Sequence, residues 1–316
     1  MLIVCITSPS LVRVTNHHFG KKYFHSREAI SPYLICPEAV RKIFYPAYFY
    51  VAPLFPIYNY FFMNFNLDKI PLRSSKPRTS GLTIISDKGL SLTEAKNLLS
   101  VAGPYIDMVK FAFGTAVVTS LLKEKIALYQ SYQIPVYFGG LLFEAYLIRN
   151  QVPDFIKLVE SNNIDYIEVS DGASKITHRQ KCDYIRQFCK TGTVISEVGA
   201  GDKDKVQVTP PYRWIEIMQE ELEAGARYVV TEGQESGTAG IYRDSGEVRE
   251  GLVAEILNKI TPEKIIWEAP KKDQQLYFIK LLGCNANLAN ISPAEVIAME
   301  AMRVGLRGDS FDFFLT

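Results

Sequence analysis

The stretch LTIISDKGLSLTEAKNLLSVAGPYIDMVKFAFG (residues 82–114) contains the unit on which the fold is built. It begins with a short apolar run, Leu82–Ile85, and passes through a polar turn into a segment in which Ser91 and Glu94 have the spacing of a helix capping box. A second apolar run, Met108–Phe111, follows this helical segment. A strand, a helix and a strand in this order predict a βαβ unit with two parallel strands.

The same alternation continues to the end of the chain and predicts eight strand–helix units. The predicted strands are 82–85, 108–111, 136–138, 166–169, 194–197, 228–231, 265–267 and a short one that starts at 287. The first predicted helix begins near residue 91. The helices of the later units are 116–130, the pair 142–150 and 154–161, 178–190, 212–224, 252–259, 273–282 and 294–304. Eight units in about 235 residues match a (β/α)8 TIM barrel of the α/β class, with a doubly wound open sheet as the alternative. No G-x-G-x-x-G follows the first strand, so a dinucleotide-binding fold is not supported.

The composition is that of an ordinary globular protein. The chain has 316 residues, of which 47% are hydrophobic and 22% charged, and its formal net charge is +1. These values exclude a disordered or fibrous protein, and they provide no basic excess for nucleic acid or for an anionic membrane. Five scattered cysteines are too few for a disulfide scaffold. We therefore expect a packed barrel over residues 63–316 and no nucleic-acid partner.

Residues 1–62 differ from the remainder of the chain. They hold 14 of the 38 aromatic residues and carry a net charge of +4, against −3 for the rest. Residues 43–62 are uncharged and long enough to cross a membrane as a helix, but Pro46, Pro53 and Pro56 would break that helix repeatedly. Neither a signal-type apolar core nor a cleavage site is evident. We expect no membrane span here.

Three interpretations of this N-terminal extension stay open. It is a poorly ordered segment, a tether lying at a membrane interface, or upstream sequence translated from a misplaced start, with Met63 as the true first residue. Mass spectrometry of the native N-terminus tests the last of these. In every case we expect the function to reside in residues 63–316.

The C-terminal ends of the predicted strands carry charged residues, and active sites of (β/α)8 barrels lie at that end. Lys110, Glu168, Glu197 and Glu268 lie within or beside apolar runs, where an ionised side chain needs a partner. Strand ends also meet solvent, which explains some charge without any function. We expect these four side chains to line one cavity. Other polar residues at the strand ends are Asp87, Lys88, Glu144, Asp171, Glu232, Glu235, Asn287, Asn290, Arg307 and Asp309.

Several carboxylates without histidine favour a hard cation such as Mg²⁺ over zinc. His178 is the only histidine after residue 62, and we interpret it as a surface residue at a helix start. Cys182 and Cys189 are seven residues apart, and we interpret both as packing residues. On these grounds we do not expect a tetrahedral zinc site.

Glycines in the loops after the strands predict places where backbone N–H groups can approach an anion. The candidates are Gly139, Gly140, Gly237 and Gly240, with Arg307 to offset a phosphate or carboxylate charge. The alternative is a set of surface loops with ordinary glycines. Lys110 itself keeps three possible roles: a Schiff-base nucleophile, a proton donor or a fixed positive charge.

The chain from about residue 64 to residue 314 resembles the phosphosulfolactate synthase family. The blocks that carry the resemblance, in chain order, are KFAFGT (110–115), GG with FE (139–140, 143–144), EVSDG (168–172), EVG (197–199), EGQESGTAGIY (232–242), WEAP with QQ (267–270, 274–275), NLANI (287–291) and GLRGD (305–309). Ala289 stands where the family pattern has glycine, and residues 1–62 have no counterpart in it.

The resemblance implies a TIM barrel enzyme that adds sulfite to phosphoenolpyruvate with Mg²⁺, giving (2R)-2-O-phospho-3-sulfolactate. On this basis we expect Lys110 to protonate C2 of the substrate, and Glu168, Glu197 and Glu232 to hold or orient the metal. The expected substrate-binding residues are Lys88, Gly139, Gly140, Gly237, Gly240, Asn290 and Arg307. In methanogenic archaea this reaction opens a route to coenzyme M, and in bacteria it can feed sulfolactate formation.

Two alternatives stay open beside this reading, because a fold does not guarantee an activity. One is another barrel lyase or aldolase that acts on a phosphorylated three-carbon acid, through a Schiff base on Lys110. The other is a non-catalytic barrel with a protective role, as in a plant branch of the family associated with heat-stress tolerance. We further expect a cytoplasmic protein that forms a homo-oligomer.

Overall fold

The computed structural model of the chain describes residues 2–8, 11–16, 64–199 and 209–315. The chain divides into two units, Met1–Ile57 and Tyr58–Thr316. In the first, β1 (Leu2–Ser8) and β2 (Leu11–Asn16) pair antiparallel. The uncharged stretch 43–62 and the predicted boundary at residue 63 lie outside the described residues, so the interpretations of the extension stay predictions.

Eight parallel strands of the second unit form a nearly closed barrel, as the sequence predicts. The strands are β3 (Thr83–Asp87), β4 (Met108–Phe111), β5 (Val136–Phe138), β6 (Tyr166–Val169), β7 (Thr193–Val198), β8 (Tyr228–Thr231), β9 (Ile265–Glu268) and β10 (Leu288–Ile291). The hydrogen-bonded order β5-β4-β3-β10-β9-β8-β7-β6 follows the chain around a ring, and the end strands β5 and β6 contact each other. A doubly wound sheet would instead reverse its order at a switch point, so that alternative is wrong.

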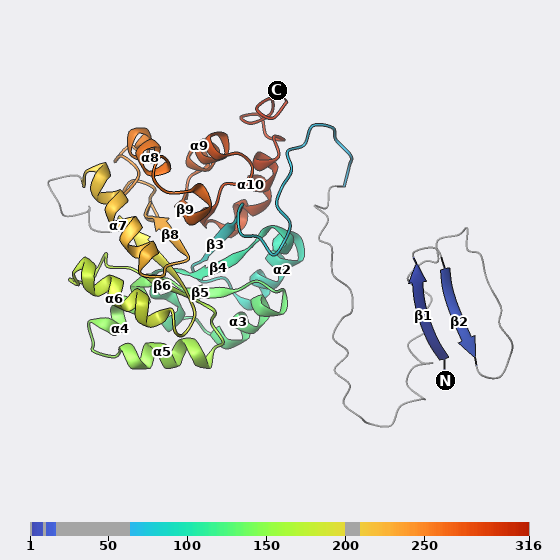
Figure 1. Cartoon of the computed structure of the whole chain (residues 1–316), viewed down its shortest axis with the longest axis horizontal. Helices are drawn as coiled ribbons and strands as arrows, with labels where there is room; N and C mark the ends of the chain where they lie inside the picture. The colour runs from blue at the N-terminus through green and yellow to red at the C-terminus, as the bar shows by residue number, and fades with distance from the viewer. Residues whose placement is uncertain (1, 9–10, 17–63, 200–208, 316) are drawn as a thin grey trace. The chain divides into compact units, whose positions relative to one another are not determined.

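Helices follow the strands and cover the outside of the barrel (Figure 1). They are α2 (Leu92–Ala102), α3 (Leu122–Ser131), α4 (Gly140–Leu147), α5 (Val152–Ser161), α6 (His178–Phe188), α7 (Pro211–Glu223), α8 (Glu250–Leu257), α9 (Lys272–Leu282) and α10 (Val296–Arg303). The predicted capping box of α2 is present: the Ser91 hydroxyl accepts from the Glu94 N–H at 3.2 Å, and the Glu94 carboxylate accepts from the Ser91 N–H at 2.8 Å. Within the described residues, no helix is both long and apolar enough to span a membrane.

The helix predicted over 116–130 begins later than the sequence indicates. Residues Ala112–Val117 form a 3₁₀ segment interrupted at Phe113 and Gly114, which have φ angles of 54° and 68°. Leu121, directly before α3, is also left-handed with a φ of 54°. Left-handed residues cannot continue a right-handed helix, so α3 starts only at Leu122. The irregular segment brings Phe113 to the C-terminal end of the barrel, where it borders the cavity described below.

Candidate active site

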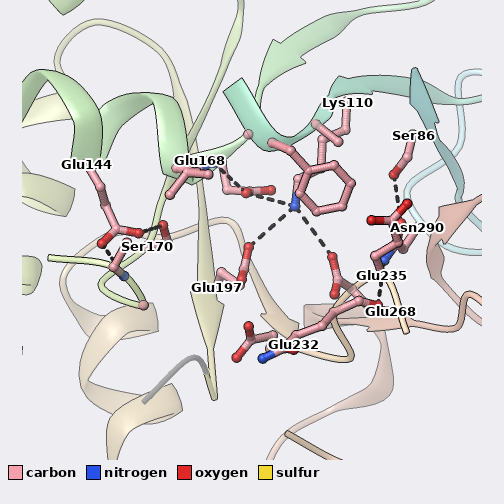
Figure 2. A pocket seen from close by; sticks show the side chains of 18 of the residues that line it. Ser86, Lys110, Glu144, Glu168, Ser170, Glu197, Glu232, Glu235, Glu268 and Asn290 are labelled. Atoms are coloured by element: carbon pink, nitrogen blue, oxygen red, sulfur yellow. Dashed lines mark hydrogen bonds and ion pairs between the residues drawn. The ribbon is translucent and has the colours of Figure 1, made fainter. Parts of the chain in front are cut away.

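Lys110 lies at the centre of a ring of carboxylates at the C-terminal end of the barrel (Figure 2). Its Nζ atom is 2.9 Å from Glu168 Oε1, 3.4 Å from Glu197 Oε2 and 3.4 Å from Glu268 Oε1. The side chains come from β4, β6, β7 and β9, so four separate strands contribute. Lys110, Glu168 and Glu197 are each the last residue but one of their strand and Glu268 is the last residue of β9, so all four lie at the C-terminal ends of their strands. The expectation that these four residues lie together is confirmed.

Two of the carboxylates are fixed by backbone N–H groups that follow the preceding strand in the chain. Glu168 Oε1 accepts a hydrogen bond from the Gly140 N–H at 2.7 Å, and Glu268 Oε2 accepts one from the Gly233 N–H at 2.9 Å. A Cβ atom at Gly140 would lie 2.4 Å from the Ser170 hydroxyl, so only glycine lets the backbone at residue 140 lie this close to Ser170. The two loops therefore orient the oxygens that face Lys110.

The ring changes the proton affinities of its members. Burial disfavours the charged form of Lys110, but its three carboxylate neighbours outweigh this effect and raise the pKa of the ammonium well above its usual value. Burial raises the pKa of Glu168 to about 8 and also raises the pKa of Glu268, although Lys110 opposes both shifts. The pKa of Glu197 is lowered, because Lys110 and a hydrogen bond with Glu168 outweigh the cost of its burial. The ring therefore favours the charged form of Lys110, while its carboxyl groups differ from one another in their affinity for a proton.

The ring forms the floor of a cavity of about 540 Å³. Besides the ring, the cavity is lined by Ser86, Ala112, Phe113, Gly139, Gly140, Leu141, Glu144, Ser170, Gly172, Ala173, Glu232, Gln234, Glu235, Ser236 and Asn290. The many charged and polar side chains among these residues suit a small, highly charged substrate better than a large apolar one.

Two hydrogen-bonded groups shape the wall of this cavity. Glu144 accepts hydrogen bonds from the Ser170 hydroxyl and from the backbone N–H groups of Ala173 and Ser174, so it holds the loop that follows β6. On the opposite side, Asn290 Oδ1 accepts from the Ser86 hydroxyl at 2.9 Å, and its Nδ2 donates to the Gln234 carbonyl at 2.9 Å. These contacts join β3 and β10 to the loop after β8.

The structure brings together most, but not all, of the predicted site residues. Lys110, Glu168, Glu197, Glu232, Gly139, Gly140 and Asn290 line the cavity. Lys88 lies outside it and forms an exposed ion pair with Glu235 at 2.6 Å. Gly237, Gly240 and Arg307 are not among the lining residues, and the guanidinium of Arg307 is 4.0 Å from Asp309. The substrate-binding roles assigned to these four residues stay predictions.

The sequence predicts Glu268 in the cavity but gives it no catalytic or metal-binding role, and it does not single out Ser86, Ser170 and Gln234 as wall residues. Glu268 ends the apolar run of β9, so its position was readable, but its partner on β4 is 158 residues away in sequence. Ser86 and Ser170 had a weaker signal, because serine beside a strand end is common in any loop. Only the barrel geometry brings these residues to one wall.

The donor atoms of the ring fit a hard divalent cation. They are carboxylate oxygens, and Glu168 Oε2 is buried without a hydrogen-bond partner among the described residues. Mg²⁺ usually takes one or two protein carboxylates together with waters and substrate oxygens. One or two of Glu168, Glu197 and Glu232 could hold such an ion directly and the others through water, with Lys110 beside it to limit the net negative charge.

Comparison with known proteins gives a consistent result. Residues 71–309 match the family described as (2R)-phospho-3-sulfolactate synthase (ComA). The chain is 40% identical over 249 residues to the phosphosulfolactate synthase of Bacillus subtilis (strain 168), which covers 78% of this chain and 98% of that protein. It is 36% identical over 244 residues to the phosphosulfolactate synthase of Methanothermobacter thermautotrophicus, and this match covers 76% of this chain and 95% of that protein. It is 40% identical over 237 residues to the phosphosulfolactate synthase of Methanocaldococcus jannaschii, and this match covers 73% of this chain and 94% of that protein. The matched residues include every strand of the barrel.

Proposed function

Because the chain belongs to the (2R)-phospho-3-sulfolactate synthase (ComA) family and is an enzyme of that kind, we propose that its carboxylate ring adds sulfite to phosphoenolpyruvate. The sulfur lone pair forms a bond to C3, and the π electrons of the C2–C3 bond move toward C2 and the carboxylate. A proton delivered to C2 then completes (2R)-2-O-phospho-3-sulfolactate. No bond to phosphorus breaks, and no oxidant or reductant is needed.

The observation that carries this proposal is the single ammonium held among three carboxylates on the floor of the cavity. Its raised pKa keeps Lys110 protonated at neutral pH, as both a proton donor and a fixed positive charge require. A Schiff-base lysine must lose its proton before it attacks a carbonyl, so the same shift disfavours the aldolase alternative. Sulfite brings its own lone pair, so no protein nucleophile is needed.

We further propose that Glu168, Glu197 and Glu232 hold Mg²⁺, directly or through water. When bound, the ion would act as a Lewis acid on the substrate carboxylate, where negative charge develops. The buried and unsatisfied Glu168 Oε2 supports this assignment. Glu268 would then orient Lys110 rather than bind the metal, because its second oxygen already accepts from the Gly233 N–H.

Substrate anions would bind at the rim of the cavity. Asn290 lines the wall, and Lys88 could exchange its exposed partner Glu235 for a phosphate oxygen. In this proposal the glycine loops at Gly139, Gly140, Gly237 and Gly240 offer backbone N–H groups, and Arg307 supplies further positive charge.

The direct test incubates the full chain with phosphoenolpyruvate, sulfite and Mg²⁺ and follows the formation of the sulfonate by ¹H and ³¹P NMR. We expect product only when all three are present. Loss of phosphoenolpyruvate without sulfite, or a borohydride-trapped adduct on Lys110, would instead identify a different lyase or aldolase. No reaction under any of these conditions would favour the non-catalytic alternative.

Two substitutions separate the roles of Lys110. Lys110→Ala should abolish turnover in either role. Lys110→Arg keeps the positive charge but binds its proton too tightly to donate it, so a fixed-charge role would retain part of kcat and a donor role would not. The exposed Lys123→Ala serves as the matched control and should keep full activity.

We also propose that the protein is cytoplasmic and forms a homo-oligomer, and that its product feeds coenzyme M or sulfolactate formation. Support for self-association comes from Val117, Val118 and Leu121, whose exposed fractions of 72%, 82% and 56% are large for apolar side chains. Light scattering on the purified chain tests this, and a monomeric mass would contradict it.

A further inference from the structure

A second group of ligand-forming side chains lies on the outside of the barrel, between α6 and α7. His178 Nε2 is 3.5 Å from Cys182 Sγ and 2.8 Å from Glu220 Oε2. His178 and Cys182 are four residues apart on α6 and so lie on the same face of the helix, and Glu220 approaches from α7. His178 is therefore not the isolated surface residue that the sequence suggested. None of these residues lines the catalytic cavity.

The spacing of the three ligand atoms suits a tetrahedral ion. With metal–sulfur and metal–nitrogen bonds of about 2.3 and 2.0–2.1 Å, tetrahedral angles place the sulfur and nitrogen about 3.5 Å apart. The observed distance between Cys182 Sγ and His178 Nε2 is 3.5 Å, and the three ligand atoms all lie within 4.8 Å of one another. Glu220 now lies at hydrogen-bond distance from the ring, so its side chain, which is 52% exposed, would move outward by about half an ångström to share an ion.

The other nitrogen of His178 faces a buried carboxylate. His178 Nδ1 is 3.6 Å from Glu221 Oε1, and the Glu221 side chain is fully buried. Histidines that bind metals usually direct their second N–H at a carboxylate, which fixes the tautomer and leaves the Nε2 lone pair available. Here that lone pair would face Cys182 and Glu220. The same Glu221 oxygen forms an ion pair with Lys181 Nζ at 2.8 Å, which holds this carboxylate beside the His178 ring.

We propose that His178, Cys182 and Glu220 bind a divalent transition-metal ion of the zinc class, with water as the fourth ligand. A thiolate and an imidazole select such ions over Mg²⁺, which prefers oxygen. The ion would join the start of α6 to the end of α7. Lys181 lies between the two α6 ligands in sequence and donates to the Glu197 carbonyl and to Asp171 Oδ1, so the ion would also stabilise the outer support of the ring.

Binding must release the thiol proton of Cys182. Its pKa is raised, first by burial and then by the nearby Glu221. The metal has to overcome this cost, as it does at other cysteine sites. Because the ion takes the place of this proton, binding would release a proton from the protein.

The test uses Co²⁺ as a spectroscopic probe on the full chain, after metal removal and in the presence of excess Mg²⁺ to occupy the oxygen site. We expect one equivalent of Co²⁺ to give a thiolate-to-cobalt charge-transfer band in the near ultraviolet and the intense visible absorption of a tetrahedral ion. One equivalent of Zn²⁺ should remove both. Absence of the charge-transfer band at stoichiometric Co²⁺ would overturn the proposal.

Variants identify the ligands. Cys182→Ser should abolish the charge-transfer band, and His178→Gln and Glu220→Gln should each weaken Co²⁺ binding by more than tenfold, since even loss of an outer-shell partner costs about 10- to 100-fold. Cys189→Ser is the matched control, because Cys189 lies at the other end of α6 and its thiol donates to the Gly225 carbonyl. A band that survives in Cys182→Ser but disappears in Cys189→Ser would place the ion elsewhere and overturn the assignment.

A second measurement does not depend on the spectrum. An ion that binds only the folded chain raises its melting temperature. Zn²⁺ should raise the Tm of the unmodified chain by clearly more than that of Glu220→Gln at the same concentration, while the Mg²⁺-dependent turnover of this variant stays normal without zinc. Equal Zn²⁺ shifts in both proteins would contradict the role of Glu220.

Discussion

The central feature at the scale of single residues is an imbalance of charge around Lys110. One ammonium faces the carboxylates of Glu168, Glu197 and Glu268, all of them buried or nearly so. Buried carboxylates without enough positive charge either take up protons or attract a cation. The raised pKa of Glu168 and the proposed binding of Mg²⁺ both have the same physical cause, which is the excess of negative charge around Lys110.

Neutralising one member of the ring tests this balance. In Glu268→Gln an amide replaces a carboxylate 3.4 Å from Lys110 Nζ, so the pKa of Lys110 should fall and its orientation should loosen. Because a positioned proton donor contributes about 10²–10⁴-fold to rate, we expect kcat to fall by at least about tenfold with little change in stability. Steady-state kinetics checks this. Glu124→Gln, an exposed carboxylate on α3 outside the cavity, is the control, and an equal loss in both variants would contradict a specific role for Glu268.

A residue far from the site provides a prediction on pH. Lys76 donates hydrogen bonds to the carbonyls of Gly103 and Ile106, and its partial burial lowers its pKa from 10.5 to about 8. The folded state therefore binds this proton less tightly than the unfolded chain, so its charged form opposes folding below pH 8. That cost disappears as the pH rises from about 8 to 10.5.

The measurement compares urea unfolding of the unmodified chain and of Lys76→Met across this range. The stability of the unmodified chain relative to the variant should rise with pH by on the order of 1–3 kcal/mol, given about 1.4 kcal/mol per pKa unit. The same comparison with the exposed Lys96→Met should show no such slope. A difference that stays constant with pH would show that Lys76 is not destabilised by burial.

At the scale of elements, the loop after β8 depends on one glycine. Gly240 has a φ of 62°, and a Cβ atom there would lie 2.1 Å from the Glu232 carbonyl oxygen. Gly240→Ala should therefore displace Glu232, a cavity residue and proposed metal ligand, and raise the Mg²⁺ concentration needed for half-maximal activity by about tenfold or more. Mg²⁺ titration of activity provides the measurement. Gly251→Ala has open space around it and should behave like the unmodified chain.

The elements were more predictable from the sequence than the details of the site. Strands such as Ile265–Glu268 are short apolar runs, and the capping box at Ser91 is a local signal, so both are readable without a structure. The late start of α3 was not, because nothing in its sequence identifies Leu121 as left-handed. Likewise, the pairing of Lys110 with Glu268 depends on ring closure across 158 residues, which only the fold supplies.

At the scale of the whole barrel, a buried arginine closes the face opposite the site. The Arg303 guanidinium donates to the carbonyls of Cys284 and Ala286 at 2.8 Å and of Leu82 at 3.1 Å, so it links the segment before β10 to the start of β3. Arg303→Met would leave these carbonyls buried without their donor and should lower the free energy of unfolding by about 3–5 kcal/mol.

Chemical denaturation measures that loss. The control is Arg186→Met, which removes an exposed ion pair with Asp183 and should cost less than about 1 kcal/mol. Activity per folded molecule should survive in Arg303→Met, because the residue lies far from the ring in the barrel. A stability change of similar size in both variants would contradict the structural role of Arg303.

The barrel should fold and function without the N-terminal extension. Every strand of the barrel and every residue of the carboxylate ring lies after residue 82, and the family match begins at residue 71. Arg73 and Arg78 lie before the first strand of the barrel, β3, and form buried ion pairs with Glu300 and Asp107, respectively. The contacts of the barrel therefore begin in this segment.

A chain of residues 63–316 should therefore match the full chain in Tm and in sulfite-dependent turnover, whereas one that begins at residue 80 should lose stability. Thermal unfolding and the NMR assay compare the three chains. A marked loss on removal of residues 1–62 alone would show that the extension supports the barrel, and it would rule out Met63 as the natural first residue.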